Sequence, residues 1–171
     1  VEIQDIPKSR STRNVIHKAF KGCILFDDMD NETVEQLIDT MEMRTEPSGV
    51  EVVTQGDTDS PDMFVIERGQ VAVFITDKEG QTRRVNEQGP GTRFGDLAFM
   101  YYCARSSTVK VEQAATMWVL QRKVYNRVNV LHAEQVQRRK EELVANVPVF
   151  KMLDAAHRQT IVEALIPVTF Q

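Results

Sequence analysis

The sequence predicts an α+β protein in which an antiparallel β jelly-roll barrel is flanked by N- and C-terminal helices. Between residues 50 and 121, short segments rich in β-branched and aromatic residues alternate with turn signals. On both sides of this stretch the spacing of apolar residues is helical. With 171 residues and 42% hydrophobic residues, the chain can form one domain and part of another.

The first eleven residues are polar, with several serines and one proline, and predict a flexible lead-in over 1–11. A short helix is expected over 12–22. A clearer helix follows, capped by Asp30 or Asn31. Its apolar residues fall at i, i+3, i+4 and i+7, and they are Val34, Leu37, Ile38 and Met41.

The strands are expected where β-branched and aromatic residues gather. They are predicted at 50–54, 64–67, 71–76, 108–112 and 117–120. Turn signals separate them at Gly56-Asp57, Arg68-Gly69, Glu79-Gly80 and Gly89-Pro90-Gly91. The segment 94–110 interrupts the series, so it must form a loop or a short helix between two strands. A break of this kind is where a barrel commonly holds a ligand.

After Leu120 the apolar pattern returns to a helical period. Val124, Val128 and Leu131 share one face, and a charged helix with a solvated face is expected over 133–145. Trp118, the single tryptophan, is expected to pack in the core beside the strands. The main domain is therefore predicted over 12–146.

Seven positions of the N-terminal helical region recur near the C-terminus at a constant offset of 124 residues. Phe26, Met29, Asp30, Leu37, Ile38, Asp39 and Met41 recur as Phe150, Leu153, Asp154, Ile161, Val162, Glu163 and Leu165. The segment 147–171 is therefore predicted to begin a second, truncated repeat.

The segment 94–110 carries the chemistry of a nucleotide site. Gly95 lets backbone approach a ligand, and Asp96 can accept hydrogen bonds from a pair of ribose hydroxyls. Arg105 offers a planar cation suited to a phosphate. Ser106 and Ser107 add short donors and leave backbone N–H groups accessible to an anion.

This segment resembles the phosphate-binding cassette of the cyclic-nucleotide-binding domain family, which reads Phe-Gly-Glu-Leu-Ala-Leu, a spacer, then Arg-Ala-Ala-Thr-Val. The resemblance covers nearly the whole chain and is strongest to the regulatory subunits of cyclic AMP-dependent protein kinase. Supporting segments are Asp5-Ile-Pro-Lys8, Ile24-Leu25-Phe26, Gln55-Gly56-Asp57, Phe64-Val65-Ile66 with Gly69, and Trp118. The resemblance implies a ligand site made of Gly95, Asp96, Leu97, Ala98, Arg105, Ser106 and Ser107.

Several positions depart from the family pattern. Asp96 stands where the family has a glutamate that holds the ribose 2′-hydroxyl, and its oxygens reach roughly 1.3–1.5 Å less far. Either the cassette moves inward, a water bridges the gap, or affinity for cyclic nucleotides falls. The helical residue that pairs with the acid in the family corresponds to Gln137, beside Arg138, and the aromatic lid corresponds to Ala156. Ser106 could contact guanine as threonine does in cyclic GMP sites.

The resemblance implies a cytoplasmic nucleotide sensor that has no chemistry of its own and controls a protein kinase catalytic subunit. Its expected ligand is cyclic AMP (cAMP). Two alternatives stay open: a cyclic GMP-binding region of a cyclic GMP-dependent kinase, and a diverged site for another purine ligand such as a nucleoside. Retention of Arg105 argues against a phosphate-free ligand, because an unpaired buried guanidinium is costly.

Other functions are disfavoured by composition and pattern. A net charge of −4 argues against a nucleic-acid partner, and no stretch approaches the roughly 18 apolar residues of a membrane span. Cys23 and Cys103 are isolated thiols that suit a reducing cytosol, and the histidines lack metal-ligand spacing. An enzyme would need a general base near the cassette, and a transcription factor would need a helix-turn-helix after the long helix. A channel domain would need membrane spans upstream.

Overall fold

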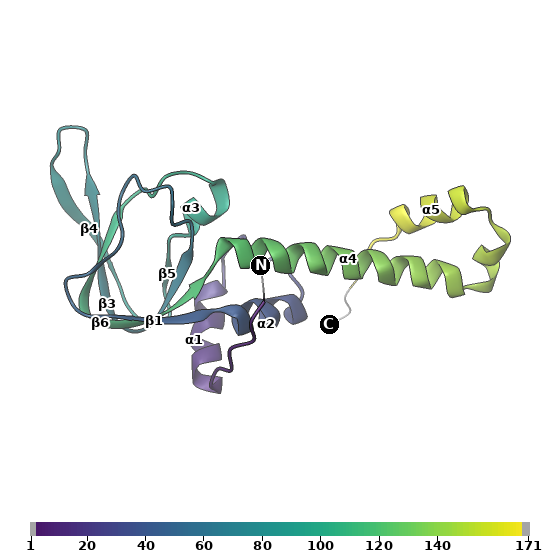
Figure 1. Cartoon of the computed structure of the whole chain (residues 1–171), viewed down its shortest axis with the longest axis horizontal. Coiled ribbons are helices and arrows are strands. Elements are labelled where there is room, and N and C mark those ends of the chain that lie inside the picture. The colour runs from purple at the N-terminus through teal and green to yellow at the C-terminus, as the bar shows by residue number, and fades with distance from the viewer. Residues whose placement is uncertain (1–2, 169–171) are drawn as a thin grey trace. The chain divides into compact units, whose positions relative to one another are not determined.

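Helices at both ends of the chain flank a run of antiparallel strands in the structure, a computed structural model that describes residues 3–168 (Figure 1). In chain order the elements are α1 (Arg10–Phe20), α2 (Asn31–Thr40), β1 (Glu42–Glu46), β2 (Glu51–Val53), β3 (Met63–Thr76), β4 (Thr82–Gln88), β5 (Arg93–Phe94), α3 (Asp96–Tyr101), β6 (Thr108–Leu120), α4 (Arg122–Asn146), the 3-10 helix η1 (Pro148–Met152) and α5 (Ala155–Ala164). The chain divides into two units between Val128 and Asn129, and each is described by itself.

All six strands of the described chain belong to one antiparallel sheet in the first unit. β6 pairs with β1 and β2, and β3 pairs with β4, β5 and β6, so the two longest strands form the centre. The predicted α+β class with jelly-roll strands between helices is confirmed, although the strand pairing leaves the sheet open. Strands begin at residue 42, ahead of the predicted start at 50.

Four of the predicted strands are halves of longer ones, which is a correction to the sequence prediction. The segments 64–67 and 71–76 both lie in β3, and 108–112 and 117–120 both lie in β6. β1, β4 and β5 lie outside all the predicted strands. In β4 every residue except Gln88 is exposed, so the strand lacks the alternation of apolar and polar residues by which a strand is predicted.

The predicted turn at Arg68-Gly69 is also wrong, because β3 continues through it as an irregular strand. The register between β3 and β6 shifts around this point, and Gly69 adopts a φ of 85°. A Cβ on Gly69 would lie 2.4 Å from the carbonyl oxygen of Ala114 and 2.6 Å from the Cα of Ala115. Glycine therefore lets a bulge pass close to the neighbouring strand, and it bends the sheet rather than reversing the chain.

Both N-terminal helices begin at side-chain caps. Ser9 accepts a hydrogen bond from the backbone N–H of Thr12, so α1 starts at Arg10 and ends at Phe20, two residues earlier at each end than predicted. Asp30 accepts from the N–H of Thr33 at 2.8 Å, which settles the choice of cap for α2.

The apolar residues of the first unit form two clusters. One joins α1, α2 and the start of α4 to the strands, and within it Phe20 stacks on Phe26 with ring centroids 3.8 Å apart. Trp118 belongs to this cluster and is 6% exposed, as the sequence predicted. The other cluster lies within the sheet region and includes Phe64 and Phe94, whose rings stack with centroids 4.9 Å apart. Phe94 on β5 thus belongs to the second cluster, whereas Phe99 on α3 belongs to the first.

The residues before α1 contact the rest of the first unit at several points. The N–H of Ile6 donates to the carbonyl of Asp39 at 2.8 Å. The Lys8 ammonium donates to the carbonyl of Ile6 at 2.9 Å and lies over the ring of Trp118, 4.7 Å from its centroid. Trp118 in turn donates through its ring nitrogen to Glu67 at 2.8 Å.

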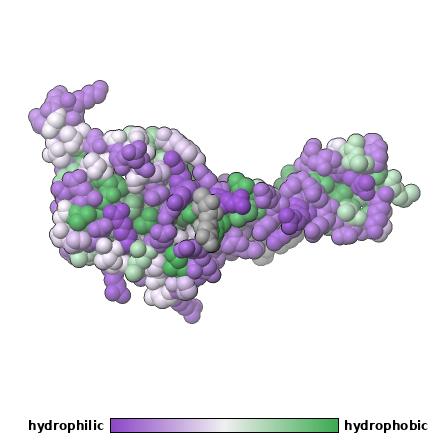
Figure 2. All heavy atoms as spheres, in the orientation of Figure 1, coloured by the Kyte–Doolittle hydropathy of each residue, from purple (hydrophilic) through white to green (hydrophobic). Residues whose placement is uncertain are grey.

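The second unit contains most of α4, η1 and α5. The two predicted helices after Leu120 are one continuous helix, α4. Figure 2 shows hydrophilic side chains along α4 and apolar ones gathered near η1 and α5, where Val149 and Met152 are 64% and 89% exposed. No helix among the described residues is both long enough and apolar enough to cross a membrane.

The hydrogen bonding supports the internal repeat that the sequence suggests. Asp154 caps α5 by accepting from the N–H of His157, just as Asp30 caps α2 from Thr33, and both pairs are 124 residues apart. The two helices also begin and end at positions separated by this offset. That the C-terminal segment starts a second domain stays a prediction.

We expect Gly69→Ala to lower the free energy of unfolding by about 2–4 kcal/mol, because it combines left-handed strain with a steric clash. Gly80→Ala is the matched control, since Gly80 has a φ of 83° but a Cβ there would meet nothing within 4 Å. It should cost only about 1–2 kcal/mol. Urea denaturation of both variants measures the difference. Equal losses would show that the close approach at Gly69 is unimportant.

Candidate functional site

The segment between β5 and β6 forms the short helix α3, preceded by a glycine that makes room for an arginine. Gly95 has a φ of 83°, and a Cβ there would lie 2.5 Å from Nη1 of Arg105 and 2.8 Å from the carbonyl oxygen of Asp62. Two constraints thus require glycine at this position: a left-handed backbone and a guanidinium packed against it. Of the two predicted forms for this segment, a loop or a short helix, the structure has a short helix at α3.

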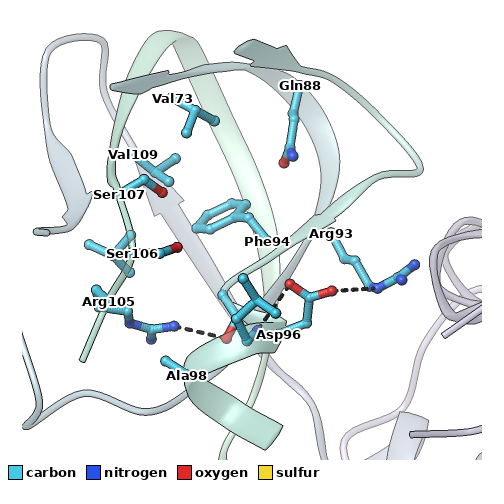
Figure 3. A pocket seen from close by; sticks show the side chains of 13 residues that line it. Val73, Gln88, Arg93, Phe94, Asp96, Ala98, Arg105, Ser106, Ser107 and Val109 are labelled. Carbon is cyan, nitrogen blue, oxygen red and sulfur yellow. Dashed lines mark hydrogen bonds and ion pairs between the residues drawn. The ribbon is translucent and has the colours of Figure 1, made fainter. Parts of the chain in front are cut away.

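A cavity of about 130 Å³ lies beside α3 and between the strands (Figure 3). Its lining includes all seven residues that the sequence predicted, namely Gly95, Asp96, Leu97, Ala98, Arg105, Ser106 and Ser107. The structure adds Val53, Val73, Gln88, Arg93, Phe94 and Val109. The valines come together because Val109 pairs with both Val53 and Val73 in the sheet register. Nothing in the sequence pattern pointed to Gln88 or Arg93.

Arg105 is buried at one end of the cavity, with 4% of its surface exposed. Its Nη1 donates to the carbonyl of Gly95 at 3.0 Å, and its Nη2 donates to the carbonyls of Asp62, at 2.6 Å, and Ser60. Burial lowers the pKa of Arg105 below its usual value, although the nearby Asp62 and Asp57 favour the charged form. Its Nε–H is shielded from solvent and has no hydrogen-bond partner. One donor of a buried cation is therefore unused.

The backbone of Arg105 is held by the turn that follows β2. The N–H of Arg105 donates to the carbonyl of Asp57 at 2.8 Å, and the N–H of Gly56 donates to the carbonyl of Arg105 at 2.8 Å. The next residues, Ser106 and Ser107, line the cavity wall (Figure 3). These two hydrogen bonds give the Gln55-Gly56-Asp57 segment a structural role, because they fix the backbone position of Arg105.

Asp96, the cassette acid, has its basic partner on the preceding strand. Its Oδ2 lies 3.4 Å from Nε of Arg93, and its Oδ1 accepts from the N–H of Leu97 at 3.2 Å. Arg93 also donates through Nη1 to the carbonyl of Ala19, at the end of α1, at 2.7 Å. Gln137, at the position where the family resemblance placed a partner, hydrogen-bonds Glu141 within the second unit. The acid is thus linked to α1 through Arg93.

A second set of contacts links α3 to the start of α4. Asp62 accepts from the N–H of Arg122 through Oδ1 at 3.2 Å, and its carbonyl accepts from Arg105. Arg122 donates to the carbonyl of Ala98 at 3.2 Å, and its guanidinium lies 3.9 Å from the ring centroid of Tyr102. Asp62 and Arg122 therefore connect the cavity to the helix that leaves the first unit.

The lining of the cavity offers several kinds of group that can bind a ligand. The cavity combines a buried cation, a carboxylate, short hydroxyls and an apolar wall of valines. Among residues 3–168, no group of three or more His, Cys, Asp and Glu side chains is arranged to hold a metal ion. The arrangement suits a ligand with an anionic end, hydroxyl groups and a flat apolar part.

Comparison with known proteins agrees with this geometry. Residues 44–128 match the family model of the cyclic nucleotide-binding domain. The cAMP-dependent protein kinase type II regulatory subunit of Drosophila melanogaster is 29% identical over 164 residues. The match covers 96% of this chain and 42% of the fly protein, so the chain spans less than half the length of that relative.

Two solved structures are also similar. The regulatory subunit of a cAMP-independent protein kinase A from Trypanosoma cruzi, bound to guanosine, is 25% identical with a TM-score of 0.61, over 96% of this chain and 56% of that one. The regulatory domain of Toxoplasma gondii protein kinase A, crystallised with cAMP, is 22% identical with a TM-score of 0.62, over 92% of this chain and 60% of that one. The Toxoplasma likeness shows the fold alone.

We expect Arg93 and Asp96 to be energetically coupled by about 0.5–1 kcal/mol, because they form a partly shielded ion pair. A double-mutant cycle of Arg93→Gln and Asp96→Asn, followed by urea denaturation, measures this coupling. Arg93→Gln should cost more than Asp96→Asn, since it also leaves the Ala19 carbonyl without its donor. Strictly additive effects would argue against the pairing.

Proposed function

Because this chain belongs to the cyclic nucleotide-binding domain family, we propose that it is the ligand-sensing part of a protein kinase regulatory subunit. The proposed ligand is cAMP, and the proposed partner is a kinase catalytic subunit whose activity the ligand controls. The observation that carries the proposal is the buried Arg105, which lines the cavity and has an unpartnered Nε–H. An anionic oxygen would satisfy this donor and offset the buried charge.

The lining residues suggest how a cyclic nucleotide would sit. The cyclic phosphate would take the end formed by Arg105 and Ser106, with backbone N–H groups of the cassette as further donors. The ribose hydroxyl would face Asp96, and the base would lie toward the wall that contains Val73 and Val109. This arrangement uses the charged, polar and apolar parts of the cavity for matching parts of the ligand.

The contacts around Arg105 also suggest how binding would be transmitted. A phosphate would compete with the carbonyls of Gly95 and Asp62 for the guanidinium. Asp62 in turn holds the first residue of α4, so its movement would be passed to that helix. Two arrangements of α4 would then be in equilibrium. A ligand shifts this equilibrium only to the extent that it binds one arrangement better than the other.

A purine nucleoside is a second candidate ligand. The terminal nitrogens of Arg105 are already satisfied by three backbone carbonyls, so the buried cation depends less on a phosphate than a free guanidinium would. The similar Trypanosoma cruzi structure is bound to guanosine. Cyclic GMP is a third candidate, with the hydroxyl of Ser106 placed at the cavity wall.

Isothermal titration with cAMP, cyclic GMP, 5′-AMP, guanosine and inosine tests these proposals. We expect a cyclic nucleotide to bind, and Arg105→Lys to weaken its binding by roughly 10- to 100-fold, because a charge-assisted hydrogen bond is lost. Lysine keeps the charge, while alanine would leave three carbonyls without donors and could unfold the site. Arg83→Lys, on the exposed strand β4, is the control for the same change elsewhere.

Three results of this titration are informative. Binding of cAMP that is unaffected by Arg105→Lys would contradict the assigned phosphate contact. If only guanosine or inosine binds, and binds equally to the wild type and to Arg105→Lys, a nucleoside is favoured as the ligand. No binding of any of these ligands would overturn the proposed nucleotide sensor.

We expect Asp96→Glu to tighten cyclic nucleotide binding by about two- to tenfold, since the longer side chain would reach a ribose hydroxyl. The effect is measured by titration of cAMP into both proteins. Weaker binding would instead show that the pair of Asp96 with Arg93 has become part of a rebuilt pocket.

A further inference from the structure

Three buried side-chain polar atoms of the described chain have no hydrogen-bond partner, and all three belong to residues that line the cavity. They are Nε of Arg105, Nε of Arg93 and Oε1 of Gln88. The first would meet the phosphate in the proposed function, and the second lies 3.4 Å from the carboxylate of Asp96. Gln88 is the one that neither the fold nor the proposed function explains.

Gln88 lies at the end of β4, where this exposed strand meets the buried part of the sheet. It is the last residue of that strand and pairs with the fully buried Val71, while the other residues of β4 are exposed. In Figure 3 its amide points into the cavity from the side opposite Arg105. Val73, Val109 and Phe94 also line the cavity, and their side chains cannot donate a hydrogen bond.

A buried carbonyl oxygen without a donor is unfavourable, and native proteins rarely leave one unexplained. Because the donor does not come from the protein, we infer that it comes from the ligand. We propose that Gln88 determines base specificity, with its side-chain amide accepting a hydrogen bond from an N–H group on the base of the bound nucleotide. This inference rests on the proposed function and assigns a role to a residue outside the cassette.

The base is the part of the ligand that fits this position. Of the charged residues that line the cavity, Arg105 and Asp96 lie away from Gln88, and Arg93 is paired with Asp96 (Figure 3). Phosphate and ribose are therefore accommodated elsewhere. The valine wall suits the apolar face of a purine. A glutamine amide presents an acceptor beside a donor, and this pair matches the 6-amino edge of adenine or the N1–H and O6 edge of guanine. A base without such an N–H should therefore bind more weakly.

The test compares nucleotides that differ only at this edge. Purine riboside 3′,5′-cyclic phosphate lacks both the 6-amino group and a ring N–H, whereas cAMP and cyclic GMP each offer a donor. We expect the wild-type chain to bind the better of these two roughly tenfold more tightly than the unsubstituted purine. Gln88→Leu should reduce this ratio to near one without weakening binding of the unsubstituted purine. Gln81→Leu, at an exposed position in the turn before β4, should keep the ratio.

The result also separates this inference from the proposed function. Binding of cyclic nucleotides with the same ratio in wild type and Gln88→Leu would overturn the role of Gln88 and leave the sensor intact. Absence of binding by every cyclic nucleotide would overturn both. Thermal denaturation without ligand gives a second readout. Gln88→Leu should raise the melting temperature, since it removes an unsatisfied buried polar group, and a lower one would show that the oxygen is satisfied in the free protein.

Discussion

The guanidinium of Arg105 is the interaction on which the site depends. It lies buried against Gly95, donates to the carbonyl of that residue, and also donates to the carbonyls of Ser60 and Asp62 in the segment before β3. A buried cation of this size requires several oriented acceptors, so the segment before β3, the start of α3 and the start of β6 must all be in place together. Any side chain at Gly95 would occupy the space of the guanidinium.

In the proposed function, the same interaction would let the site respond to a ligand. A bound phosphate would compete for the guanidinium, and the carbonyls that would lose hydrogen bonds lie next to α3 and α4. Asp96 provides a separate connection, through Arg93, to the end of α1. The proposed site is thus in contact with helices that precede and follow the sheet in the chain, which is the arrangement a sensor needs.

The two copies of the capped helix show how far local sequence acts by itself. Asp30 and Asp154 begin helices at equivalent positions, because a carboxylate that accepts from the third N–H works wherever it occurs. In α2 the apolar face is buried against the rest of the first unit, with Leu37 fully shielded, whereas in α5 only Val162 is buried. The helix is a local property, and its burial depends on what is packed against it.

The sequence by itself determined the fold class and the capped helix α2, because apolar periodicity and caps are local signals. It also predicted a ligand site whose seven residues all line the cavity. Only the tertiary structure decided that Arg68-Gly69 bends a long strand, since the bulge is defined by its approach to Ala114 on β6. It also decided that Arg93 is the partner of Asp96 and that Gln88 faces the cavity. These roles arise from strands that meet through long-range pairing, and no short sequence pattern encodes which side chains such pairing brings together.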